Sequence, residues 1–203
     1  MGQDAVFVHL FEKYFAQKEY SWLTQQGRKM ITDRAYSLMA NIMGTPAAEV
    51  ELPDSTGAMR SLYKDSSAYS IVMFWDPTCG HCKEELPHID SIYRASWKQH
   101  GVKIYAALSA DSKDELKNDW IKYTKEHNLQ DWINVYQTKE TEAAIQSAQK
   151  AGYRQLYDVT MTPTLYLLDK EKRIIGKKLT WKQIDELLQV KWSGTPAPDS
   201  TNK

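Results

Sequence analysis

The sequence predicts an α/β fold in which a central mixed sheet is flanked by helices, with an α-helical segment in front of it. Residues 70–75 and 102–108 are apolar runs typical of buried strands, and a helical pattern joins them. A strand–helix–strand unit of this kind places its two strands in parallel through a right-handed crossover. Residues 162–169 and 173–177 flank a short turn and predict an antiparallel pair, so we expect a mixed sheet.

The pattern divides the chain into three parts. Residues 1–45 are predicted to form the helical segment, residues 46–192 hold the α/β domain, and residues 193–203 are rich in Pro, Ser and Thr and are predicted to be a disordered tail. The chain has 203 residues, of which 42% are hydrophobic, with seven Trp and twelve Tyr. It can therefore bury a substantial core without disulfide bonds.

Charge and hydropathy argue against several classes of function. The chain carries 26 basic and 26 acidic residues, and this balance does not suggest a nucleic-acid or membrane-surface partner. No apolar run approaches the roughly 18 residues of a membrane span, so no transmembrane segment is expected. Asp4 precedes the first short apolar stretch without a basic region before it, which is unlike a signal peptide.

The N-terminal segment is predicted to form two amphipathic helices over residues 4–43, with a break at Gly27 and an end at Gly44-Thr45-Pro46. Two apolar stripes predict faces that pack on a neighbour: Phe7, Leu10 (or Phe11) and Tyr14 in the first, and Ile31, Ala35, Leu38 and Ile42 in the second. No residue here points to chemistry, and a partner-binding role stays open.

A β-hairpin is expected next, because residues 49–52 and 58–62 flank a turn-rich segment. The strand over residues 70–75 then leads to the cysteines. A helix is predicted from about Gly80 to His100, ended by Gly101.

The second half of the chain supplies further helices and strands. Two capping boxes predict helix starts, Ser112-Lys113-Asp114-Glu115 and Thr180-Trp181-Lys182-Gln183. The expected inward faces are Leu116, Trp120 and Tyr123 in the first helix, and Trp181, Ile184 and Leu188 in the last. Between them we expect a strand over residues 132–136 and a helix over residues 141–151 ended by Gly152, whereas residues 153–159 are ambiguous.

The two cysteines have two residues between them and lie where the first buried strand meets its helix. A C-x-x-C pair in this setting indicates a dithiol redox centre. Cys79 lies at the helix N-terminus, where unpaired N–H groups and the helix dipole stabilise a thiolate. Cys82 lies one turn further in and can resolve a mixed disulfide. We expect His81, as a donor or a positive charge, to favour the Cys79 thiolate further.

A zinc site and an inert cysteine pair are the alternatives. Zinc usually needs four ligands, often as a second C-x-x-C or as two histidines three to five residues apart. The candidate histidines are His9, His81, His88, His100 and His127, which lack that spacing. No metal and no organic cofactor are therefore expected, and the redox group would be the Cys79–Cys82 disulfide itself.

The residues around this turn resemble the thioredoxin superfamily. The motif is Val72-x-Phe74-Trp75-x3-Cys79-Gly80-His81-Cys82-Lys83-x-Glu85-x-Pro87, with Met161-Thr162-Pro163-Thr164 further on. Its C-x-x-C-x-x-E-x-P run is similar to that of the TlpA-type thiol–disulfide oxidoreductases of bacterial cell envelopes, over roughly residues 46–190. The preceding helical segment resembles that of Bacteroides-group envelope lipoproteins that carry a C-terminal thioredoxin domain.

The resemblance implies a thioredoxin-like fold with an N-terminal β-hairpin and an inserted helix–strand element. It also implies that Cys79 attacks and Cys82 resolves. Pro163 would be a cis-proline facing the disulfide, and Thr162 would offer backbone groups to an extended substrate. Pro87 would kink the active-site helix, with a helix that starts later than Pro87 as the alternative.

The chain departs from the thioredoxin pattern at the acid that assists the second cysteine, because Met73 stands in its place. Glu85, one turn beyond Cys82, matches the acid of the TlpA-type run and is the candidate substitute; a solvated carboxylate or an ion-pair partner is the alternative reading. The motif also marks Trp75, Gly80 and His81 as residues that modulate the site. The Gly80-His81 pair is that of protein disulfide isomerases.

The predicted function is exchange of dithiol and disulfide with protein substrates through Cys79-Gly80-His81-Cys82, as a reductase in the cell envelope or periplasm. The resemblance implies an upstream redox partner protein and a lipid anchor in the full-length protein. The alternatives are a thioredoxin-fold binding module with little redox turnover, and an isomerase or oxidase. A peroxidase is disfavoured because Asp76, rather than Thr or Ser, stands three residues before Cys79.

Overall fold

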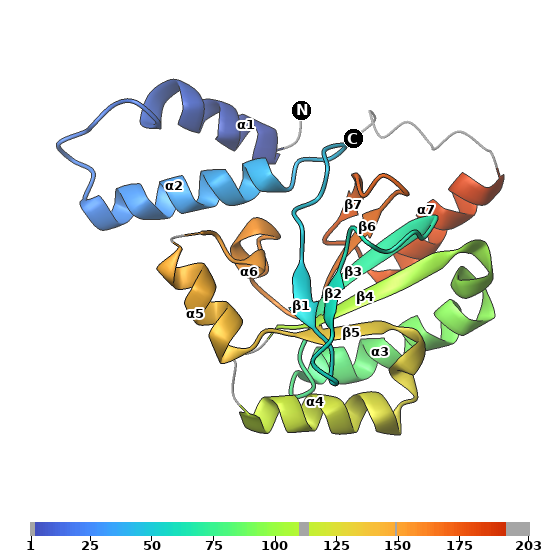
Figure 1. Cartoon of the computed structure of the whole chain (residues 1–203). Coiled ribbons are helices and arrows are strands. Elements are labelled where there is room, and N and C mark those ends of the chain that lie inside the picture. The colour runs from blue at the N-terminus through green and yellow to red at the C-terminus, as the bar shows by residue number, and fades with distance from the viewer. Residues whose placement is uncertain (1–2, 110–113, 149, 194–203) are drawn as a thin grey trace.

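The computed structural model describes residues 3–109, 114–148 and 150–193 (Figure 1). At its centre is a five-stranded sheet in the order β5-β4-β3-β6-β7. The strands are β3 Tyr69–Trp75, β4 Val102–Leu108, β5 Ile133–Tyr136, β6 Thr164–Leu168 and β7 Ile174–Lys177. β3, β4 and β5 are parallel, whereas β6 and β7 join as antiparallel strands. The predicted mixed sheet is therefore confirmed.

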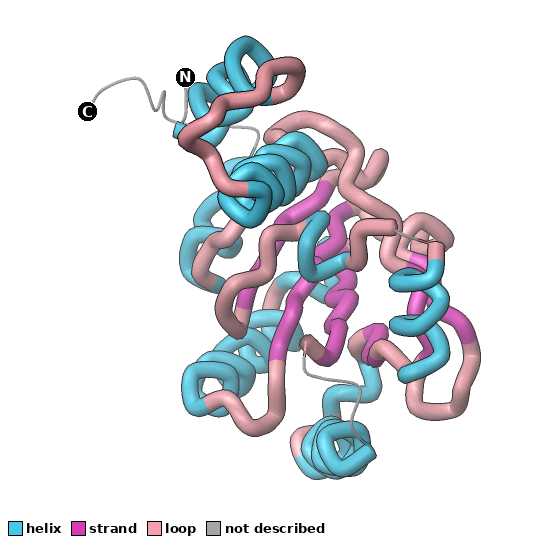
Figure 2. The backbone as a smooth tube through the Cα atoms, turned by 90° about the vertical axis from the view of Figure 1, so that its left-hand side faces the viewer, coloured by secondary structure: helices cyan, strands magenta, loops and turns pink. Residues whose placement is uncertain are grey.

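Helices and a hairpin enclose the two faces of the sheet, which Figure 2 shows from the side. One face carries α3 (Gly80–Ala95), α4 (Asp114–Glu126) and α7 (Trp181–Ser193). The other face carries the hairpin of β1 (Glu51–Pro53) and β2 (Met59–Ser61), together with α6 (Tyr153–Leu156). Alternate residues of β3 feed the two cores, with Ile71, Met73 and Trp75 on the α3 side and Val72 and Phe74 on the hairpin side.

The helix that follows the cysteines ends earlier than the sequence predicted. α3 ends at Ala95, Ser96 breaks it, and Trp97–His100 form a separate 3-10 turn that closes at Gly101 with φ 74°. The break lets Trp97 enter the core completely, where its Nε1 donates to Asp185 Oδ1 at 2.8 Å. A wholly buried indole that also has a partner for its N–H group explains the local departure from a continuous helix.

The N-terminal segment forms two helices, α1 (Gln3–Leu10) and α2 (Gln25–Ala40), as predicted, but the expected break at Gly27 is wrong. The connection covers residues 16–24, and Gly27 lies inside the first turn of α2. The reason is the N-cap residue Thr24, whose side chain accepts a hydrogen bond from the Gly27 N–H at 3.1 Å.

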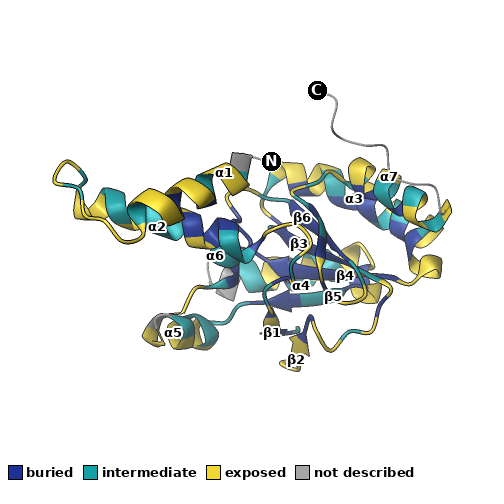
Figure 3. Cartoon of the chain, turned by 90° about the horizontal axis from the view of Figure 1, so that it is seen from above, coloured by how far each residue is buried: buried dark blue, intermediate teal, exposed yellow. Residues whose placement is uncertain are grey.

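The buried faces of these helices match the predicted stripes in part. In the first stripe the alternative residue Phe11 is buried, together with Val8, whereas Leu10 and Tyr14 are exposed. Tyr14 lies in the π-helical turn Phe11–Phe15, which adds a residue to the repeat. In α2 the expected Ala35 and Leu38 are buried, but Ile42 follows the helix end and is exposed. Figure 3 shows α1 and α2 largely exposed on their outer sides.

Polar contacts tie the N-terminal helices to the α/β domain. Asp4 lies 2.6 Å from Lys177 Nζ. Asp158, which is 8% exposed, binds both Arg34 from α2 and Lys178, the latter at 2.5 Å. The Asp4–Lys177 and Arg34–Asp158 pairs each join residues more than a hundred positions apart, whereas the Lys178–Asp158 pair is local. The segment is thus anchored by charge as well as by its two buried stripes.

The remaining elements follow the prediction with one exception. The helix α5 covers Lys139–Ser147, and Gly152 is the N-cap of α6 rather than the end of α5. The second capping box is confirmed, because the Thr180 N–H donates to Gln183 Oε1 at 2.9 Å. The start of the first capping box, Ser112 and Lys113, and residues 194–203 of the predicted tail lie outside the described residues, whereas Ser193, the first residue predicted for the tail, ends α7. No helix within the described ranges has the length and apolar character to cross a membrane.

Candidate dithiol site

The loop between β3 and α3 is held by its own side chains. β3 ends at the wholly buried Trp75, and Asp76 Oδ1 then accepts hydrogen bonds from the Thr78 N–H at 2.7 Å and from its hydroxyl at 2.6 Å. The Cys79 N–H donates to the Asp76 carbonyl at 3.2 Å. Asp turns of this kind fix the backbone locally, so the loop delivers Cys79 to the N-cap position of α3.

The two thiols have unlike surroundings. Both are free, with Cys79 half-buried and Cys82 completely buried. Burial raises the pKa of Cys82 to about 12, although the Asp76 N–H group and the Thr162 hydroxyl act in the opposite direction. One thiol of the pair is therefore reachable, and the other is kept protonated inside the domain.

The pKa of Cys79 is lowered from its ordinary value. Partial burial would raise it, but hydrogen bonds from the Thr162 hydroxyl, from Cys82 and from the backbone N–H groups of Cys82 and His81 outweigh that effect. These donors favour the thiolate at the start of α3, as expected for a cysteine at a helix N-terminus.

His81 acts on Cys79 through its backbone rather than through its ring. The side chain is 83% exposed, and its Nδ1 lies 3.6 Å from Glu84 Oε2. Gly80, beside it, has nothing within 4 Å of the position of an added Cβ, so the surface next to Cys79 is open. The imidazole thus lies on the exposed rim of the site.

The loop before β6 brings Thr162 and Pro163 against the cysteines. The Thr162–Pro163 peptide bond is cis, as the resemblance implied. In the thiol form, Cys79 Sγ donates to the Thr162 carbonyl at 3.3 Å across 83 residues of sequence. The Thr162 hydroxyl also lowers the pKa of both thiols, an effect that no local sequence pattern predicts.

Pro87 lies inside α3, so the alternative of a later helix start is wrong. Proline has no N–H group, and the carbonyl of Lys83 therefore lacks its usual helical donor. The opposite face of α3 is anchored by Leu86, Ile89 and Tyr93, all buried at the predicted spacing. This anchoring holds the helix in place despite the missing hydrogen bond.

The position of the missing acid is occupied by Met73, which is completely buried in the core. Glu85 is half-buried on α3, and within the described part of the chain its carboxylate has no hydrogen bond or ion pair. The Glu85 carboxylate therefore has no protein partner among the described residues. It lies one turn beyond Cys82 and is partly exposed, so a water molecule can reach it.

Tyr123 is a neighbour of the site that the sequence placed only on the inward face of α4. Its ring packs on Trp75 with centroids 5.3 Å apart and stacks on His127 at 4.1 Å. The pKa of Tyr123 is raised, first by burial and then by the negative charge that Cys82 can carry. The phenol therefore lies close enough to sense the second thiol.

Metal binding has no visible support at this site. Across the described ranges, no group of three or more His, Cys, Asp or Glu side chains is arranged to hold a metal ion. The arrangement therefore offers two thiols whose pKa values are shifted in opposite directions, beside the backbone carbonyl of Thr162.

Comparison with known proteins identifies the family of this chain. Residues 43–177 match the AhpC/TSA family. A search of curated proteins found no match. A thioredoxin-like protein from Bacteroides caccae is similar in structure, with 26% identity and a TM-score of 0.70, over 93% of this chain and 62% of that protein. This chain therefore spans less than two thirds of that relative's length.

Two further structures cover more of their own length. A domain of a possible thiol-disulfide isomerase from Cytophaga hutchinsonii is 32% identical, with a TM-score of 0.60, over 75% of this chain and 95% of that domain. A thiol:disulfide interchange protein from Bacteroides sp. is 24% identical, with a TM-score of 0.60, over 81% and 97%, and shows the shared fold. The thioredoxin-like fold and the TlpA-type resemblance are confirmed, and the chain belongs to the AhpC/TSA family of thioredoxin-like proteins.

Proposed function

We propose that the protein is a thiol–disulfide oxidoreductase that reduces protein disulfides in the cell envelope through Cys79 and Cys82. One observation carries the proposal: the reachable thiol has a lowered pKa, while its buried partner has a pKa raised to about 12. A dithiol that exchanges with substrate disulfides needs this asymmetry, because the first cysteine must attack while the second remains a thiol.

In the first step the Cys79 thiolate attacks a substrate disulfide. A bond forms between Cys79 Sγ and one substrate sulfur, the substrate S–S bond breaks, and the other substrate sulfur leaves as a thiolate that takes up a proton. The backbone around Thr162 and Pro163, which lies beside Cys79 Sγ, is proposed to hold the substrate in an extended conformation.

In the second step Cys82 loses its proton and attacks Cys79 Sγ. The mixed disulfide breaks, the substrate leaves as a thiol, and the protein keeps the Cys79–Cys82 disulfide, so two electrons have passed to the substrate. Glu85 is the proposed proton acceptor through water, since Met73 supplies no acid. A dithiol partner protein upstream would return the two electrons to the pair.

The location and anchoring are part of the proposal. The TlpA-type resemblance supports the cell envelope, or periplasm, and a lipid anchor in the full-length protein. Fractionation of cells that produce the full-length protein tests both, since recovery in the cytoplasmic fraction would contradict them.

Trapping tests the reaction itself. A Cys82→Ser variant should accumulate mixed disulfides with envelope proteins, because the resolving thiol is gone, and the matched Cys79→Ser variant should accumulate none. The wild type should reduce a model protein disulfide when a dithiol is supplied. If Cys82→Ser traps no partner and the wild type leaves the model disulfide intact, the protein is a binding module rather than an enzyme.

The reduction potential of the pair decides the direction. We expect a value near the −270 mV or so of thioredoxin, whereas a value approaching the −120 mV or so of DsbA would overturn the reductase assignment in favour of an oxidase or isomerase. Peroxide turnover should be slower than disulfide exchange. Asp76, whose carboxylate is already bound by Thr78, takes the place of the Thr or Ser that the peroxidase motif requires before the cysteine.

A further inference from the structure

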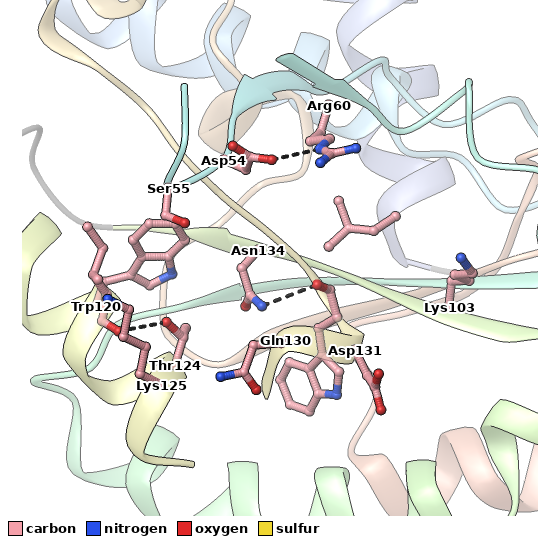
Figure 4. A pocket seen from close by; sticks show the side chains of 13 residues that line it. Asp54, Ser55, Arg60, Lys103, Trp120, Thr124, Lys125, Gln130, Asp131 and Asn134 are labelled. Atoms are coloured by element: carbon pink, nitrogen blue, oxygen red, sulfur yellow. Dashed lines mark hydrogen bonds and ion pairs between the residues drawn. The ribbon is translucent and has the colours of Figure 1, made fainter. Parts of the chain in front are cut away.

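A cavity of about 440 Å³ lies at the edge of the sheet, away from both cysteines (Figure 4). It opens where the tip of the β1–β2 hairpin, the strand β5 and the helix α4 meet. Its wall includes Arg60, Lys103, Trp120, Lys125, Trp132 and Asn134. The volume is within the range of about 300–1,000 Å³ that is usual for ligand pockets.

Three buried polar atoms of this wall have no hydrogen-bond partner among the described residues. They are the indole Nε1 atoms of Trp120 and Trp132 and the side-chain oxygen Oδ1 of Asn134. Trp120 is completely buried and Trp132 is 4% exposed. Buried donors and acceptors are almost always paired, and three of the seven unpaired buried side-chain atoms of the described residues belong to this one wall, where another molecule can complete them.

The orientation of Asn134 is determined by its other contacts. Its Nδ2 donates to the carbonyl of Leu129 at 2.6 Å and to that of Trp132 at 3.2 Å, so the amide oxygen must be the free end. In Figure 4 the nitrogen edge of the Trp120 indole faces Asn134. The cavity wall thus offers donors and an acceptor together, which is the complement of a peptide group.

The charges at the cavity favour an anion. Both carboxylates of the wall are already neutralised, because Asp54 pairs with Arg60 at 2.8 Å and Asp131 pairs with Lys98 at 2.7 Å. Lys125 has no ion pair within the described part of the chain. Lys103 is paired with Asp65, at 3.9 Å. The ammonium group of Lys125 is therefore the one available to an acidic ligand.

The strand beneath the cavity, β5, lies at the edge of the sheet and has a partner strand on one side only in the described structure. β5 is the outermost strand on its side of the sheet, and it pairs only with β4 in the described structure. An edge strand presents unpaired backbone N–H and C=O groups, to which an extended peptide can add as a further strand. An extended segment along β5 would pass the free oxygen of Asn134.

We propose that this cavity binds an extended acidic peptide segment along β5. Carbonyl groups of the segment accept from the indole N–H groups of Trp120 and Trp132, a segment N–H donates to Asn134 Oδ1, and a segment carboxylate meets Lys125. The three unpaired atoms are themselves buried, so the peptide can reach them only if side chains at the entrance of the cavity move. Lys125 lies exposed at this entrance. The site uses neither cysteine, so it stands apart from the proposed reaction.

Proton–nitrogen correlation spectra of the full chain test the proposal, because each of the seven Trp gives one indole signal. Trp120→Phe and Trp132→Phe variants assign the two signals. Titration with the blocked peptide acetyl-VEVEV-amide should move both signals downfield to saturation and leave the remaining indole signals in place. The blocked peptide acetyl-VKVKV-amide should move neither. The titration needs no redox turnover and can succeed whether or not the dithiol is active.

Matched variants on α4 make the test specific. Lys125→Glu should weaken binding of the acidic peptide about tenfold, whereas Lys122→Glu, which changes an exposed lysine outside the cavity, should leave it unchanged. The proposal is overturned if neither signal moves at millimolar peptide, if the lysine peptide binds equally, or if both variants weaken binding alike. Equal affinity for acetylglutamate amide would identify a small-carboxylate site and also overturn it.

Discussion

Replacing Thr162 with valine removes the hydroxyl that lowers the pKa of both active-site thiols and keeps the side chain close to its original shape. A hydrogen bond to a charged group is worth about 1.5–3 kcal/mol, and solvent reaches Cys79, so the lower end applies. Losing about 1.5 kcal/mol of thiolate stabilisation reduces the thiolate population about tenfold wherever the thiol form predominates. Thr162→Val should therefore slow the reaction of Cys79 with electrophiles by about that factor.

The assay is alkylation of the fully reduced protein by iodoacetamide, followed by intact-mass measurement across a series of pH values. The variant profile should shift toward higher pH, while its plateau rate at alkaline pH changes little. Thr162→Ser keeps the hydroxyl and is the matched control, with a profile close to that of the wild type. An unchanged profile for valine, or an equal shift for serine, would refute the role assigned to the hydroxyl.

Three further predictions concern the buried thiol, the ionic anchor and the core. Cys82 should stay unalkylated in the folded protein below pH 9, because burial raises its pKa to about 12; labelling there would contradict its position. Burial alone would raise the pKa of Asp158, but its two basic partners, Lys178 and Arg34, lower the pKa below 3.8. The ionised carboxylate therefore stabilises the fold above pH 3.8, and this stabilisation is lost as the pH falls through the lowered pKa. Asp158→Asn should cost about 1–3 kcal/mol at neutral pH, and the difference in Tm from the wild type should shrink in acid. Gly176→Ala should destabilise by about 1 kcal/mol, since the new Cβ would lie 2.5 Å from Leu179 Cδ1 and that flexible side chain must move, whereas Gly80→Ala, with open space, should keep the wild-type Tm.

The elements that the sequence predicted best are those whose signal is local. The apolar run of residues 70–75 became β3, and the spacing of Leu86, Ile89 and Tyr93 gave the buried face of α3. The capping box at Thr180 also formed as expected. In each case the deciding residues are neighbours in the chain, so periodicity and capping chemistry are sufficient to locate the element.

The elements that the sequence located less well depend on competing local or tertiary effects. Gly27 suggested a break, but the Thr24 side chain starts the helix before it. Ser96 interrupts the predicted long helix where Trp97 turns into the core. Gly152 begins a helix instead of ending one. A glycine or a long helical pattern is compatible with more than one backbone path, and packing selects among them.

For the active site, the sequence by itself determined the chemistry and its place: two cysteines at the start of a helix that follows a buried strand. It also supplied the proline of the facing loop through the resemblance. Only the tertiary structure decided which groups tune the thiols. The Thr162 carbonyl reaches Cys79 across 83 residues, and Tyr123 approaches Cys82 from α4. The physical reason is that backbone conformation follows from neighbouring residues, whereas burial, electrostatics and hydrogen bonds between distant segments exist only once the sheet register has brought those segments together.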